Sequence, residues 1–111
     1  MAMKRRRKPK VNAEEASRQA AVSDALTAAE TAEKLCRESV YYAGLAGAGQ
    51  DDAAEVQAAA HRARTAANEA EAATTLDGAW QAARLAWAAV TSAHEADARV
   101  TAAIAEKLLA A

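Results

Sequence analysis

The chain has few of the residues that build a conventional protein core. It contains no phenylalanine, one proline, one cysteine and four glycines, and leucine, isoleucine and valine together number only 14 among 111 residues. Alanine takes their place with 37 residues, and alanine is the strongest helix former. Because β-sheets depend on β-branched and aromatic side chains, this composition excludes an all-β or α/β domain and predicts thin, alanine-packed helices.

Other absences limit the classes of function. A single cysteine forms no internal disulfide, and no stretch of about 18 apolar residues that could cross a membrane occurs, so we expect a cytoplasmic chain without membrane contact. His61 and His94 lie on different predicted helices, and neither has the histidine four residues away that a zinc-binding helix uses. Cys36 and His94 are instead expected to be core residues. We therefore expect no enzyme activity, no catalytic residue, no metal and no cofactor.

The formal net charge of −1 hides a strong separation of charge along the chain. Residues 4–10 carry six basic side chains and no acid, whereas residues 11–111 hold eight basic and 15 acidic residues. The sequence is therefore a basic N-terminal arm attached to an acidic body. The six basic residues of the arm are Lys4, Arg5, Arg6, Arg7, Lys8 and Lys10.

This basic arm indicates a class of partner. Clustered lysines and arginines bind the phosphates of nucleic acids by releasing counterions, without reading the base sequence. No aromatic residue interleaves the cations, so the arm does not have the pattern that stacks on single-stranded bases. Pro9 disfavours a helix, and we expect residues 1–11 to be disordered. The alternatives are a solvated tail without a role and a segment that docks on the acidic body of another copy.

Capping patterns and turn formers divide residues 12–111 into predicted helices. Asn12 and Glu15 have the spacing of a capping box and open a first helix over residues 13–46. The glycine-rich stretch over residues 44–51 is the clearest break in the body.

A second and a third helix follow this break. Asp52 and Glu55 repeat the capping-box spacing and open a helix over residues 52–73. A cluster of turn formers over residues 74–78 precedes a helix over residues 77–110. The fold class is therefore predicted to be all-α, a three-helix up-down-up bundle. The alternative is a helical hairpin in which the second and third segments form one long helix.

Helix lengths predict which residues lie side by side. In the third helix, Trp80 and Trp87 begin an apolar seam with steps of three and four, and both are expected to anchor the core. At about 1.5 Å per residue, the middle helix is too short to span its neighbours. We therefore expect Trp80 near Leu26, and Trp87 near Leu35 and Cys36.

The end of the third helix is expected to project beyond the first loop, where no other segment of the chain reaches it. Uncovered apolar helical faces are typically interfaces, so we predict self-association or docking of a partner helix through residues 100–109. The alternatives are that the second and third helices are continuous, or that the first loop folds over this stripe. The predicted interface residues are Val100, Ile104, Leu108 and Leu109.

Two classes of function remain open at this stage. The first is a non-catalytic helical protein that self-associates and contacts nucleic-acid phosphates non-specifically through its basic arm. The second is a structural assembly or adaptor protein, for example a component of a phage or other particle, that binds protein partners through its helical faces.

Overall fold

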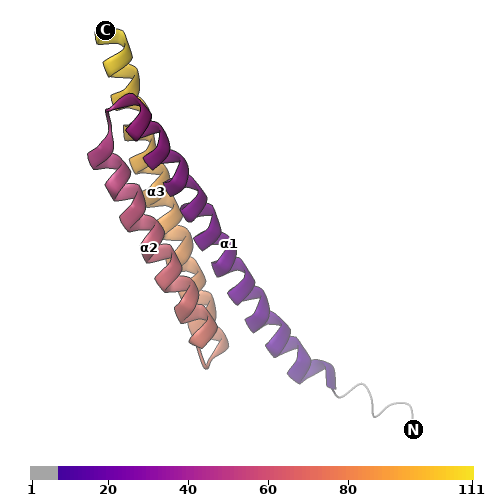
Figure 1. The fold of residues 1–111 in the computed structure, drawn as a ribbon. Coiled ribbons are helices and arrows are strands. Elements are labelled where there is room, and N and C mark those ends of the chain that lie inside the picture. Colours follow the sequence, from indigo (N-terminus) through magenta and orange to yellow (C-terminus); the bar gives the residue numbers. More distant parts are fainter. Residues whose placement is uncertain (1–7) are drawn as a thin grey trace.

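The computed structural model describes the backbone of residues 8–111 and the side chains of residues 13–111. It contains the helices α1 (Lys8–Ala46), α2 (Gln50–Ala72) and α3 (Leu76–Ala110), and no strand within the described residues. α1 and α3 run in the same direction and α2 runs back beside them (Figure 1), so that each helix contacts the other two. The predicted three-helix bundle is confirmed, and the alternative with one long second helix is wrong.

α1 begins earlier than its capping pattern predicts. Its first residue is Lys8, four residues before Asn12, and Pro9 lies in its first turn. Proline is tolerated there because the first N–H groups of a helix have no carbonyl partner in any case. The prediction that residues 1–11 are disordered is therefore wrong for residues 8–11. Residues 1–7 lie outside the part of the chain that the structure describes.

α2 also begins earlier than predicted, at Gln50. Its N-cap is Gly49, whose left-handed φ of 80° favours glycine. The predicted cap, Asp52, lies inside the first turn, where a negative charge is favourable at the positive end of the helix dipole. Gly47 has φ of 66° and donates its N–H to the carbonyl of Ala43 at 2.8 Å, which completes a tight turn between α1 and α2.

The predicted break between α2 and α3 is confirmed. Ala73 and Thr75 both have extended backbone conformations that stop α2 from continuing into α3. The side chain of Thr75 caps α3 by accepting a hydrogen bond from the N–H of Gly78 at 3.0 Å. A threonine in this position satisfies one of the N–H groups that a helix start leaves without a partner.

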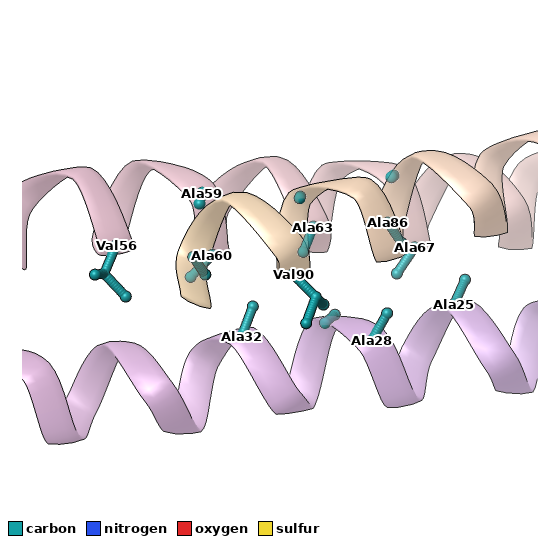
Figure 2. Packing of buried hydrophobic residues seen from close by; sticks show 14 of the residues in the cluster. Ala25, Ala28, Ala32, Val56, Ala59, Ala60, Ala63, Ala67, Ala86 and Val90 are labelled. Atoms are coloured by element: carbon teal, nitrogen blue, oxygen red, sulfur yellow. The ribbon is translucent and has the colours of Figure 1, made fainter. Parts of the chain in front are cut away.

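Alanine builds the core of the bundle. Apart from four valines, every buried apolar side chain that the structure describes is an alanine. Figure 2 shows the alanines of the three helices pointing towards one another, with Val56 and Val90 filling the larger spaces between them. Small side chains let helices approach closely, and the bundle is correspondingly slender, with extents of 78 × 22 × 15 Å.

The larger apolar side chains lie around this core and not inside it. Trp80, Trp87 and Cys36 are half-buried and pack against its edge, and His94 is exposed. The expectation that His94 is a core residue is therefore wrong, and the tryptophans support the core only from outside. The reason is steric, because close-packed alanine faces leave no room for an indole or imidazole ring between the helices.

Replacing a core alanine by leucine tests this close packing. Ala63 is 0% exposed, so Ala63→Leu forces extra carbon atoms into a filled contact. We expect it to lower the free energy of unfolding by about 1–3 kcal/mol. Ala54→Leu adds the same atoms on the exposed face of the same helix. It should shift this free energy by less than about 0.5 kcal/mol. Urea denaturation followed by circular dichroism measures both variants, and equal stabilities would contradict a tightly filled core.

Candidate functional site

Ion pairs bridge two of the three interfaces between the helices. Across α1 and α2, Arg64 donates two hydrogen bonds to the carboxylate of Glu33, at 2.7 and 2.8 Å. Across α2 and α3, Arg99 pairs with Asp52 at 3.0 Å and also with Glu55. Within the described residues, no ion pair crosses from α1 to α3. Between α1 and α3, side-chain hydrogen bonds take the place of ion pairs.

Both tryptophans lie along this α1/α3 groove in a regular register. The indole N–H of Trp80 donates to the hydroxyl of Ser17 at 3.3 Å, and that of Trp87 donates to the carboxylate of Asp24 at 3.0 Å. Each pair joins residues that are 63 positions apart in the sequence. Because the two tryptophans are one heptad apart, the repeated offset shows that the same contact recurs one heptad later between two parallel helices, as in a coiled coil.

The tryptophans contact a different part of α1 from the one predicted. Ser17 and Asp24 lie about three helical turns closer to the N-terminus than the expected neighbours Leu26 and Leu35. A helical side chain leans towards the N-terminus of its helix, which accounts for a small part of this displacement. In addition, α1 continues past the turn between α2 and α3 (Figure 1), so it still offers partners at that level.

Exposed apolar side chains gather where α1 and α3 end. Tyr41, Tyr42 and Leu45 of α1 are 61, 56 and 68% exposed, and Leu108 and Leu109 of α3 are 69 and 88% exposed. An open groove of about 420 Å³ lies between the two helix ends, lined by members of both groups. We define the terminal patch as Tyr41, Tyr42, Leu45, Ile104, Leu108 and Leu109.

A polar pair lies in the same groove. Ser39 is 2% exposed and donates its hydroxyl to the carboxylate of Asp97 at 2.5 Å, and both residues line the groove beside the terminal patch. The hydrogen bond joins α1 to α3 immediately before both helices reach their exposed ends. It therefore fixes the relative position of the two halves of the patch.

The terminal patch does not include Val100, which was the first residue of the predicted interface. Val100 is 2% exposed, because Gly49 packs so closely on it that a Cβ at Gly49 would lie 3.3 Å from Val100. Lys107 donates to the carbonyl of Gly47 at 3.1 Å and holds the same loop against α3. The prediction of Val100 as an interface residue is therefore wrong, since the α1–α2 loop folds over it. Ile104 is half-buried, and the end of α3 projects beyond the loop (Figure 1).

Sequence reasoning missed the α1 half of the patch. Tyr41, Tyr42 and Leu45 precede the glycine-rich turn directly, and all three are large apolar residues in a chain that has few of them. That concentration was a usable signal. The predicted interface contained only residues of the third helix, whereas Tyr42 and Leu45 of α1 line the same groove as Ile104 and Leu108.

The predicted nucleic-acid-binding residues stand at the other end of α1. Lys4, Arg5, Arg6 and Arg7 lie outside the described residues, and Lys8 and Lys10 belong to the first turn of α1, with side chains outside the described part. The chain thus enters α1 at the end of the molecule remote from the terminal patch (Figure 1).

A second, smaller groove between α1 and α2 brings Cys36 close to His61. The two residues line it together with Glu33 and Arg64, which are paired with each other. Burial raises the pKa of the Cys36 thiol, which keeps it protonated and weakly nucleophilic at neutral pH. Over the part of the chain with described side chains, no three histidine, cysteine, aspartate or glutamate residues converge as a metal site would require.

No protein-family model, curated protein or solved structure matches the chain. Among α1, α2 and α3 as described, none has both the length and the apolar character needed to cross a membrane. Its function is therefore inferred from its own charges and surfaces.

The ion pair between Glu33 and Arg64 predicts how stability depends on pH. The hydrogen bonds from Arg64 hold the pKa of Glu33 below its ordinary value, whereas an unfolded chain leaves a glutamate near about 4.3. Because the pKa is lowered by folding, the pair stabilises the fold above the pKa of the unfolded chain. This stabilisation is lost as the pH falls through the lower pKa of the folded state.

Glu33→Gln tests this dependence. At pH 7 we expect it to lower the free energy of unfolding by a few tenths to about 1 kcal/mol, as is usual for a solvent-accessible pair. The variant and the parent should converge as the pH falls below the lowered pKa of Glu33, where both states are protonated. Urea midpoints across this range measure the difference, with Glu69→Gln on the exposed face of α2 as the control. The same pH response in both variants would show that the ion pair contributes nothing.

Proposed function

We propose that this is a non-catalytic helical protein that self-associates through its terminal patch and contacts nucleic-acid phosphates non-specifically through residues 4–10. The observation that carries the proposal is the separation of these two features. The terminal patch occupies one end of the bundle, and α1, which follows the basic residues in the sequence, begins at the other end (Figure 1). One end is thus suited to protein contact and the other to phosphate contact.

The side chains of the terminal patch support the protein contact. Tyr41 and Tyr42 together leave roughly 200 Å² in water, given the usual area of a tyrosine and their exposed fractions of 61 and 56%. Tyrosine combines a large apolar ring with a polar hydroxyl and is enriched where proteins bind one another. Exposed leucines beside such rings are normally covered in the functional assembly.

The charges of the body support confining phosphate contact to the basic segment. Residues 11–111 contain 15 acidic and eight basic residues, and Arg18, Arg64 and Arg99 are each paired with a carboxylate. The body therefore repels a polyanion, and residues 4–10 supply the attraction. We infer a cytoplasmic location, because nucleic acid is available there and a lone cysteine suits a reducing compartment.

A second candidate function is that of an assembly or adaptor protein, for example a particle component, whose partner is a different protein. The observation that favours it is that the terminal patch is complete without the basic segment, since all its residues lie on α1 and α3. Under this alternative the basic residues only aid solubility. The chain would then bind no duplex DNA at low salt.

Binding to a duplex of about 15 base pairs, measured over a range of salt concentrations, tests the proposal. Six phosphate contacts predict that log affinity falls against log salt with a slope of about −5. A variant with glutamine at all six basic positions of residues 4–10 should lose this binding. The matched control replaces Lys34, Arg62 and Arg84, which are exposed on the body, by glutamine and should bind as the parent does. The proposal would be contradicted if the variant altered at residues 4–10 still bound DNA, or if only the control variant lost binding.

A further inference from the structure

The position of the terminal patch limits how two copies can meet. We propose that two copies pair antiparallel on their terminal patches, with their bodies pointing in opposite directions, so that the dimer holds its two basic segments about 100 Å apart. This inference rests on the proposed function and makes it specific. The partner is a second copy of this chain, and the target is duplex DNA long enough to be contacted at two separate places.

The patch carries both halves of a self-complementary contact. On α1, Tyr41 and Tyr42 form an edge-to-face pair with ring centroids 5.3 Å apart, and they stand out from the helix as a ridge. On the outer face of α3, the exposed alanines Ala98, Ala102 and Ala105 follow one another at steps of four and three as a smooth strip. In a dimer with two-fold symmetry every contact occurs twice. The ridge of each copy therefore packs on the strip of the other copy.

The exposed area favours a second copy over an isolated side chain or small ligand. To the roughly 200 Å² of the two tyrosines, the terminal patch adds Leu45, Leu108 and Leu109, which are 68, 69 and 88% exposed. A standard protein interface buries about 800 Å² on each partner, with an apolar centre surrounded by a polar rim. The patch is large enough for such a centre, and the flanking turns of α1 and α3 provide the rim.

Charge decides the direction of pairing. The acidic body, residues 11–111, has a net charge of −7 from eight basic and 15 acidic residues. If the two copies lay side by side in the same direction, these acidic bodies would face each other along their whole length. Antiparallel pairing overlaps only the ends and directs the bodies apart, which lowers the repulsion between them. The last turns of α3, which project past the α1–α2 loop (Figure 1), then lie along α1 of the partner.

The length of α1 sets the distance between the basic segments. From Lys8 to Leu45, α1 extends for about 56 Å at 1.5 Å per residue. Two such lengths in opposite directions place the starts of the two α1 helices about 100 Å apart, which corresponds to about 30 base pairs of B-DNA. A duplex much shorter than this meets one segment of a dimer, whereas a longer duplex meets both.

The mass and the shape of the purified full chain test the pairing. The chain has a mass of 11.5 kDa, so sedimentation equilibrium should give about twice this value for the parent. Leu108→Glu should shift the mass to that of the monomer. Leu85→Glu is the matched control, because Leu85 is 57% exposed but lies in the groove between α2 and α3. A monomeric parent at about 100 µM, or identical masses for the two variants, would overturn the inference.

Small-angle X-ray scattering of the same samples distinguishes the direction of pairing. A single bundle is 78 Å long, so two bundles that overlap only at their ends should reach a maximum dimension of about 130 Å. A side-by-side dimer would stay near the length of one bundle and would show that the antiparallel arrangement is wrong.

The dependence of DNA affinity on duplex length tests the separation of the basic segments. Per binding site, the parent should bind a duplex of about 60 base pairs at least about tenfold more tightly than one of about 15, and its salt slope should rise from about −5 to about −10. Leu108→Glu should lose this preference for the longer duplex, and Leu85→Glu should keep it. Equal affinities of the parent for both lengths would overturn the inference and leave the proposed function standing. No salt-dependent binding to either duplex would contradict the proposed function and, with it, the two-point contact.

Discussion

Close contact between alanine faces is the constraint on which the rest of this structure depends. Every buried apolar side chain of the described residues is alanine or one of four valines, and the helices can approach closely only because these side chains are small. Such an interior removes little apolar area from water per residue, so the bundle needs long contacts and becomes slender. It also has no space for rings, so the indoles of Trp80 and Trp87 pack at its edge.

The three interfaces between the helices are bridged by different kinds of contact. Glu33 with Arg64, and Arg99 with Asp52 and Glu55, join α2 to its two neighbours. Between α1 and α3 the contacts are of a different kind, namely hydrogen bonds from two indoles and the pair of Ser39 with Asp97. A bundle with equivalent grooves would offer no preferred side for association. This one has a single groove that ends in exposed tyrosines and leucines.

The two ends of the molecule are chemically different for independent reasons. At one end the apolar surface exists because α3 continues past the α1–α2 loop, which packs on Val100 and is contacted by Lys107. At the other end the chain enters α1 after a run of cations that has no counterpart in the acidic body. In the proposed dimer, the length of α1 sets the distance between the starts of the two α1 helices.

The fold class, the two breaks and the charge separation followed from the sequence, because composition, glycine content and local charge act without regard to distant contacts. The helix starts did not, since Asp52 and Glu55 have capping spacing but pair with Arg99 of α3. Which face of each helix turns inward was decided only by the tertiary structure. Alanine occurs around the whole circumference of these helices, so apolar periodicity barely distinguishes one face from another, and the best mutual packing of three helices selects among them.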